Sequence, residues 1–192
     1  MNRPIEFEAG EILPAAMVQQ WLKAAGKGIK IYRGCRVYPP DRVSIGDYSQ
    51  IDEGVRIFAG EEVVIGRHVH LAFGCSISGG GRCVIHDFAG IGAGVRLITG
   101  SELSDGRGLT NPTIPDELRA VKRSFVEVGA HAVVFTNSVV FPGVKIGEGA
   151  VVAAGSLVHH DLNEWGIYAG QPLIQIGTRP KEVILKQAGE LI

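Results

Sequence analysis

Aliphatic residues recur every six positions along most of this chain. A period of six fits neither the 3.6-residue turn of an α-helix nor the two-residue alternation of a lone strand. It is typical of a solenoid in which each hexad forms one side of a coil and points one aliphatic side chain inward. The predicted inward positions are Ile31, Val37, Ile45, Ile51, Ile57, Ile65, Leu71, Ile77, Ile85, Ile91, Leu97, Val128, Val134, Val140, Ile146, Val152 and Val158.

Three hexads complete one triangular coil, and every departure from the period falls at the same corner. Steps of eight residues rather than six follow Val37, Ile57 and Ile77, and a step of 31 follows Leu97. The longest step predicts a protruding loop over residues 98–125. Long loops on a rigid scaffold often carry function. The sequence therefore predicts an all-β solenoid of parallel strands with one long loop.

The two ends of the chain differ from the repeats. Residues 14–26, PAAMVQQWLKAAG, have Pro near the start and Gly at the end, which predicts a helix. A second short helix is expected over residues 180–191. Terminal units of a solenoid need caps, which such helices provide. The expected organisation is an N-terminal helical segment over residues 1–30, the β-helix over 31–177 and a C-terminal helix over 178–192.

Composition and charge exclude several classes of protein. Glycine is enriched, with 27 of 192 residues, and it follows the inward aliphatic residue at Gly46, Gly66, Gly129 and Gly147, as tight corners require. The formal charge of −1 from 19 basic and 20 acidic residues argues against nucleic acid as the main partner. The sequence has no signal segment and no apolar run of ~20 residues, so we expect a cytoplasmic protein without membrane insertion.

Three cysteines without a Cys-x-x-Cys pair predict neither a disulfide framework nor a zinc cluster. His68 and His131 occupy the same position in two different coils. Phe88 occupies that position in the coil between them, so we do not expect the two histidines to form a metal pair.

The C-terminal coils carry the most specific motif. The run FPGVKIGEGAVVAAGSLVHHDL over residues 141–162, followed by IYAGQP over 167–172, resembles the hexapeptide-repeat acyltransferases with a left-handed parallel β-helix. The similarity is greatest to the galactoside and maltose acetyltransferase-like sugar acyltransferases, and it covers about residues 31–178. It implies acetyl-CoA-dependent transfer to a hydroxyl or amine of a sugar, nucleotide-sugar or polysaccharide precursor. It also implies a homotrimer with active sites shared between chains.

The resemblance also implies a binding site for acetyl-CoA near the C-terminal coils. The His159–His160 pair stands where the family usually has Thr-Lys, and Arg179 follows positions that are basic in the family. The residues that match the family's CoA site are Thr136, Ala154, Gly155, Ser156, His159, His160 and Arg179.

The position of the family's catalytic base differs most from the family pattern. Related enzymes carry a histidine at the start of the long loop, five residues after the last inward aliphatic, where this chain has Glu102. An imidazole suits proton transfer near neutral pH better than a carboxylate does. Three interpretations stay open: Glu102 is the base, His70 is the base, or the acceptor is an amine that needs less help. His70 directly precedes inward Leu71, where galactoside acetyltransferase-like relatives have a tyrosine near the acceptor.

The resemblance also identifies acceptor-binding positions, and their residues differ from the galactoside pattern. Alanine and glycine replace an asparagine and an aspartate of the galactoside group, and a histidine stands in a turn column where glycine is normal. These positions are Ala72, Gly80 and His86. We therefore expect a sugar pocket unlike that of the galactoside enzymes.

Two other functions remain open from the sequence. A γ-type carbonic anhydrase uses the same β-helix with three zinc histidines, two of them five residues apart, and this spacing does not occur here. A non-catalytic β-helix that binds a partner or metabolite is the second alternative, which the missing loop histidine favours.

Overall fold

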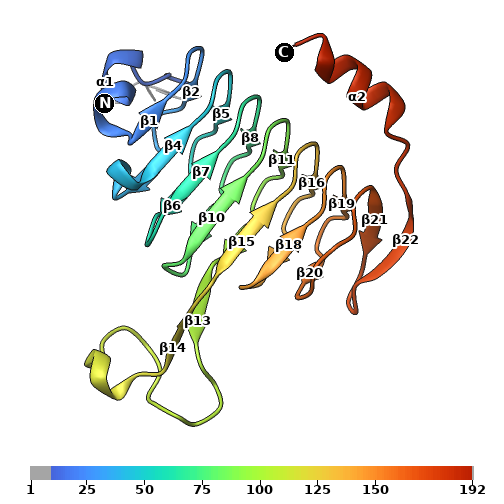
Figure 1. The fold of residues 1–192 in the computed structure, drawn as a ribbon. Helices are drawn as coiled ribbons and strands as arrows, with labels where there is room; N and C mark the ends of the chain where they lie inside the picture. Colours follow the sequence, from blue (N-terminus) through green and yellow to red (C-terminus); the bar gives the residue numbers. More distant parts are fainter. Residues whose placement is uncertain (1–9, 192) are drawn as a thin grey trace, which may run out of the picture.

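A computed structural model describes residues 10–191, which stack as triangular coils of a left-handed parallel β-helix (Figure 1). The first sheet contains, in spatial order, β1 (Ala24–Ala25), β4 (Val43–Ile45), β7 (Val63–Ile65), β10 (Arg82–Ile85), β15 (Phe125–Val128) and β18 (Val144–Ile146). The second contains β2 (Lys30–Ile31), β5 (Gln50–Ile51), β8 (His70–Leu71), β11 (Gly90–Ile91), β16 (Val133–Val134), β19 (Val151–Val152), β21 (Gly166–Ala169) and β22 (Ile174–Thr178). The third contains β20 (Leu157–Val158), β17 (Val139–Val140), β12 (Arg96–Ile98), β9 (Ser76–Ser78), β6 (Arg56–Phe58) and β3 (Arg36–Tyr38).

The core confirms the six-residue period. All of the predicted inward positions are buried except Val37, which is partly buried in the first coil. A second column of buried residues lies two positions before them, and it mixes aliphatic, small and polar side chains. Its members are Val43, Ser49, Val55, Val63, Val69, Cys75, Cys83, Ala89, Val95, Val126, Ala132, Ser138, Val144, Ala150 and Ser156.

Adjacent coils approach so closely at one corner that glycine is required there. A Cβ added to Gly46 would lie 2.6 Å from the carbonyl carbon of Gly66, and one added to Gly147 would lie 2.5 Å from the backbone nitrogen of Glu164. Contacts this short are impossible for a real side chain. The predicted role of these glycines at tight corners is confirmed.

The N-terminal helix is shorter than predicted. Helix α1 spans Ala15–Trp21 and ends at Leu22, whose backbone is extended. Ala24 and Ala25 form β1 and pair with Ser44 and Ile45 of β4. Pairing in the solenoid therefore begins inside the segment expected to be helical, because these residues complete the first coil. The part of that segment before Gly10 lies outside the described residues.

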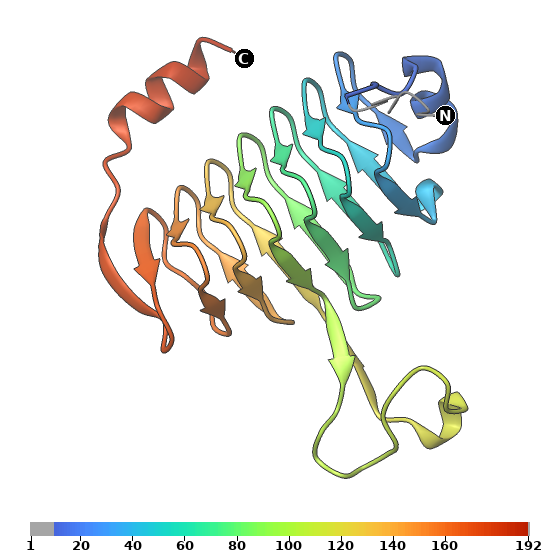
Figure 2. The ribbon, with the colours of Figure 1, turned by 180° about the vertical axis from the view of Figure 1, so that it is seen from behind.

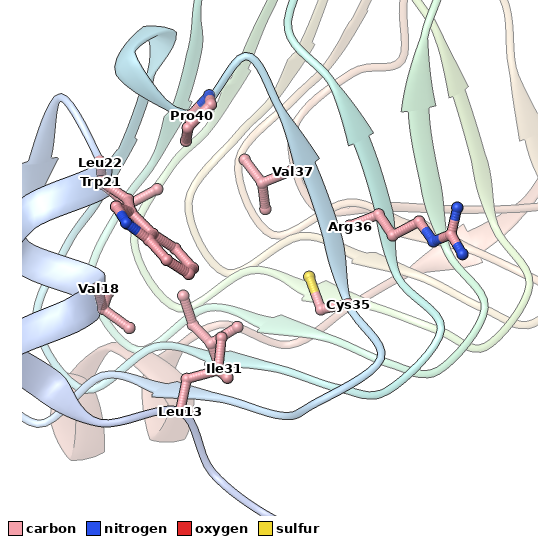
Figure 3. A pocket seen from close by; sticks show the side chains of 9 residues that line it. All are labelled: Leu13, Val18, Trp21, Leu22, Ile31, Cys35, Arg36, Val37 and Pro40. Carbon is pink, nitrogen blue, oxygen red and sulfur yellow. The ribbon is translucent and has the colours of Figure 1, made fainter.

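The space between α1 and the first coil is lined by apolar side chains (Figure 3). Val18, Trp21 and Leu22 come from the helix and the residue that follows it, and Ile31 and Val37 come from the first coil. Their packing covers the N-terminal end of the core, as the solenoid architecture requires.

The long loop protrudes at the predicted position (Figures 1 and 2). Its two arms form an antiparallel hairpin of β13 (Gly100–Glu102) and β14 (Val121–Arg123), and the 3₁₀ helix η2 (Asp116–Leu118) lies between them. The two-residue insertions also fall at the predicted corner, and the first of them contains the 3₁₀ helix η1 (Pro40–Arg42). At the C-terminus, β22 pairs antiparallel with β21 and leads into α2 (Glu182–Gly189). A helix is therefore present within the predicted C-terminal segment, of which residue 192 lies outside the described residues.

An aromatic column runs along the corner between the first and second sheets. Tyr48, His68, Phe88 and His131 stack with ring centroids 5.0–5.1 Å apart, and Trp165 lies 6.3 Å beyond His131. All five residues have a positive φ. Phe88 separates the two histidines, as the sequence predicted. No group of three or more His, Cys, Asp or Glu residues that could hold a metal occurs within residues 10–191.

Burial raises the pKa of all three cysteine thiols, to about 12 for Cys35 and Cys83 and to about 11 for Cys75. The thiolate is the reactive form, so very little of it exists at neutral or mildly alkaline pH. We expect the native protein to react far more slowly with a disulfide reagent than the protein unfolded in denaturant. The rate of thiol release under both conditions measures this, and one fast-reacting thiol in the native protein would contradict it.

Candidate active site

His70 has a carboxylate partner that fixes its orientation. Its Nε2 lies 2.9 Å from Oδ2 of Asp52, and the other carboxylate oxygen of Asp52 accepts a hydrogen bond of 2.8 Å from the side-chain amide of Gln50. The imidazole is 49% exposed and the Asp52 side chain 22%. In the neutral ring, an N–H directed at Asp52 leaves Nδ1 unprotonated. This arrangement can accept a proton from a molecule bound on the second sheet.

Glu102 has a different role in the structure. Its carboxylate accepts a hydrogen bond from the guanidinium of Arg119, which also donates to Asp116 at 2.9 Å. This bond to Glu102 is the main cause that raises the pKa of Arg119. One carboxylate oxygen of Glu102 is engaged by the guanidinium and the other is buried, so neither is open to a substrate proton. The pair joins the two arms of the long loop, and the structure therefore favours His70 over Glu102 as the base.

Three of the positions predicted to bind the cofactor lie together. Thr136, Ala154 and Gly155 are exposed at the corner between the second and third sheets, on two adjacent coils. The N–H of Gly155 donates to the carbonyl of Thr136 at 2.9 Å, and the side-chain amide of Gln171 donates to the carbonyl of Gly155 at 2.9 Å. Small side chains here leave the backbone open to a ligand.

The side chains of Ser156 and Arg179, two further predicted cofactor residues, do not lie on the exposed backbone of this corner. The side chain of Ser156 is fully buried inside the coil, and its hydroxyl donates to the carbonyl of Ala153 at 2.7 Å. The guanidinium of Arg179 donates to the carbonyls of His131 and Gly149 at 2.7 and 3.2 Å, beside the aromatic column. Burial lowers the pKa of Arg179. Its bonds hold the C-terminal segment at the corner between the first and second sheets, across the second sheet from Thr136 and Ala154.

His159 and His160 are exposed immediately after β20. Thr136 and Ala154 precede the strands of the third sheet, so the two histidines lie at the opposite ends of those strands. Their ring centroids are 5.0 Å apart in an edge-to-face arrangement. Imidazoles in such a position can donate hydrogen bonds to phosphate oxygens.

The three predicted acceptor positions are not brought together. Ala72 follows the strand of His70 in the same coil, so it lies near that histidine. Gly80 lies under Arg123, because a Cβ added there would be 2.9 Å from the guanidinium carbon. His86 is 3.1 Å from a carboxylate oxygen of Glu127 on the first sheet. Within one chain, only Ala72 adjoins the candidate base.

Two partners of the candidate bases, Asp52 and Arg119, were not predicted from the sequence. Asp52 lies 18 residues before His70 and directly follows Ile51, the inward residue that pairs with Leu71 in the next coil. That spacing was a usable signal. Arg119 lies in the irregular part of the loop, where no repeat predicts which side chains meet.

Comparison with known proteins identifies the family, although no protein-family model matches the sequence. The dTDP-4-amino-4,6-dideoxy-D-glucose acyltransferase of Escherichia coli is 31% identical over 163 residues, which are 84% of this chain and 85% of that protein. This chain belongs to the hexapeptide-repeat sugar acyltransferases. A single-residue mutant of AntD, an N-acyltransferase from Bacillus cereus, solved in complex with dTDP and coenzyme A, superposes with a TM-score of 0.88 and 28% identity, over 94% of this chain and 98% of that one.

A more distant neighbour shows how widely the fold is shared. Perosamine N-acetyltransferase from Caulobacter crescentus has a TM-score of 0.58 and 23% identity, and 78% of this chain and 56% of that one are covered.

Membership of the acyltransferase family sets aside both a zinc lyase and a non-catalytic binding protein. Among the described residues, no helix of this acyltransferase is long and apolar enough to cross a membrane.

Proposed function

We propose that this acyltransferase transfers an acyl group from a CoA thioester to the amine of a nucleotide-linked amino sugar. The observation that carries the proposal is the 31% identity, over most of both chains, with an enzyme named for dTDP-4-amino-4,6-dideoxy-D-glucose. Another mutant of AntD has also been solved with that amino sugar nucleotide and coenzyme A. The pairing of Glu102 with Arg119 supports an amine acceptor, since an amine reacts without a strong base.

The proposed reaction needs one proton acceptor. The amine lone pair attacks the thioester carbonyl, a C–N bond forms, and the C–S bond breaks. The nitrogen loses one proton, and the leaving sulfur gains one to become the CoA thiol. His70, oriented by Asp52, accepts the proton from nitrogen, and the sulfur receives it. A backbone N–H stabilises the oxyanion of the tetrahedral intermediate.

A direct assay tests the reaction and the acceptor class. With acetyl-CoA and 3-hydroxybutyryl-CoA as donors, we expect thiol release with dTDP-4-amino-4,6-dideoxyglucose and much less with dTDP-glucose, which offers only hydroxyls. Mass spectrometry of the sugar nucleotide locates the acyl group on nitrogen. Transfer to dTDP-glucose without transfer to the amine would overturn the proposal.

We also place acetyl-CoA along Thr136, Ala154 and Gly155, with His159 and His160 near its phosphates. Replacing Ala154 with Leu puts a bulky side chain on the exposed corner. We expect acetyl-CoA affinity to fall by about tenfold or more, since overpacking a fitted surface costs about 1–3 kcal/mol. Isothermal titration calorimetry measures the change. Ala16→Leu, on the exposed face of α1, is the matched control, and unchanged affinity in Ala154→Leu would show that the cofactor lies elsewhere.

A homotrimer with shared active sites is proposed as the assembly. Exposed apolar side chains support an interface, among them Phe135 and, on α2, Val183 and Leu185. Light scattering should give three times the chain mass of 20.5 kDa, and a monomer would contradict the assembly. If sites are shared, mixing His70→Asn chains with Ala154→Leu chains should restore activity, because some sites then contain neither substitution.

A further inference from the structure

The outer face of the third sheet carries a column of arginines. Arg36, Arg56, Ser76 and Arg96 occupy the same outward position in successive coils and pair in register. Within residues 10–191, none of these three arginines forms an ion pair. By contrast, Arg67 and Arg82, near and on the first sheet, are paired with Asp87 and Glu62. The third sheet therefore presents positive charge that the described part of the chain does not neutralise.

A cavity of about 350 Å³ lies on this column, at the corner with the second sheet. Gly54 and Gly74 line it together with Arg56, Ser76 and Arg96. Both glycines have a positive φ, and a Cβ on Gly74 would meet nothing within 4 Å, so the corner is bare backbone beside open space. Arg96 donates to the carbonyls of Gly74 and Gly94 at 2.6 and 2.9 Å, which holds its guanidinium at the cavity. The guanidinium of Arg56 makes no hydrogen bond within the described residues, although its backbone N–H donates to the carbonyl of Cys75.

An aromatic pair adjoins the arginines. Tyr38 and Phe58 lie next to Arg36 and Arg56 along β3 and β6, with ring centroids 5.8 Å apart, and they are 66% and 51% exposed. A second cavity, of about 430 Å³, is lined by both rings and shares Arg56 and Ser76 with the first. One continuous surface therefore carries the guanidinium groups of the arginine column and the exposed rings of Tyr38 and Phe58. The side chain of Arg36 points away from the apolar space under α1 (Figure 3).

We propose that this surface binds the nucleoside diphosphate part of the acceptor, an inference that rests on the proposed function. Arg56 and Arg96 bind the diphosphate, because guanidinium groups form bidentate, charge-assisted hydrogen bonds to phosphate oxygens. The base stacks on the Tyr38–Phe58 pair. Gly54 and Arg56 follow Asp52 in its coil, as Gly74 and Ser76 follow His70 in the next. The sugar then extends from the diphosphate around the corner to the His70–Asp52 pair.

The cofactor also contains a diphosphate, so the position of the surface matters. Arg36 and Arg56 lie on β3 and β6, toward one edge of the third sheet, whereas His159 follows β20 at the opposite edge. Arg96 lies on β12, two strands from β20. Separate binding of dTDP and coenzyme A is therefore expected. A substitution in the arginine column should affect only dTDP.

Calorimetric titrations with dTDP, thymidine and coenzyme A test the assignment. Arg56→Gln is the first variant, because its guanidinium has no hydrogen bond to lose, and Arg96→Gln is the second. We expect each to weaken dTDP binding by about 10- to 100-fold, the effect of losing a charged hydrogen bond, with thymidine and coenzyme A unchanged. Phe58→Ala should weaken thymidine and dTDP alike, by about fivefold or more. Arg82→Gln on the first sheet is the matched control, and melting curves check that each variant is folded.

The outcomes separate the two proposals. If both arginine variants bind dTDP as tightly as the wild type, and the wild type acylates the amino sugar nucleotide, only the site assignment is wrong. If coenzyme A affinity falls together with dTDP affinity, the surface belongs to the cofactor and the assignment is also overturned. If the wild type binds no nucleoside diphosphate and acylates no nucleotide-linked sugar, the proposed function fails as well.

Discussion

Replacing His70 with asparagine is expected to lower kcat by about 10²-fold while acetyl-CoA affinity stays unchanged. A general base contributes about 10²- to 10⁴-fold, and an amine acceptor places the loss at the lower end because the amine is already nucleophilic. Asparagine keeps a polar side chain of similar length but cannot accept the proton. Steady-state kinetics with dTDP-4-amino-4,6-dideoxyglucose measures kcat, and calorimetry measures cofactor binding.

Two further variants separate the proton acceptor from its surroundings. Asp52→Asn keeps the hydrogen bond to His70 but removes the negative charge, so we expect a smaller loss of kcat from this positioning residue. Glu102→Gln loses the ion pair with Arg119. We expect it to lower the melting temperature of the protein while kcat changes little. Full turnover in both His70→Asn and Glu102→Gln would mean that neither side chain is the base. The amine would then lose its proton without help from either residue.

The sequence predicted the solenoid because its packing is strictly local. Each coil pairs with the coils before and after it in register, so a six-residue period is enough to place Ile51, Leu71 and Ile91 in one column. The second buried column escaped detection because it mixes Val, Cys, Ala and Ser. The first coil was placed too late because Ala24 and Ala25 lack the aliphatic signature, although their backbones complete the first sheet.

The candidate site was predictable only where it follows the repeat. Thr136 and Ala154 lie at equivalent places in adjacent coils, so their proximity follows from the spacing. The burial of the Ser156 side chain does not follow from the six-residue aliphatic period, because this residue belongs to the mixed second column. The partners of Glu102 and Arg179 come from the long loop and from the C-terminal segment that folds back on the coils. Those contacts depend on irregular backbone, which no period predicts.

Replacing Leu71 with alanine is expected to destabilise the protein by about 2–5 kcal/mol, the range for truncating a buried leucine. Leu71 is fully buried on β8, between β5 and β11, so the cavity weakens the contacts of its coil with both neighbours. In a solenoid, stability comes from such neighbour contacts, and a loss in the middle coils is not compensated elsewhere.

The melting temperature reports the loss of Leu71. For a chain of this size, each 1 kcal/mol shifts the melting temperature by about 2–4 °C, so a decrease of several degrees or more is expected. Leu109→Ala is the matched control: the same atoms are removed from a side chain that is 55% exposed in the protruding loop, and the change should stay within about 0.5 kcal/mol. Equal melting temperatures for the two variants would contradict a core built from one inward aliphatic per hexad. A large difference would show that this core, and not the loop, holds the coils together.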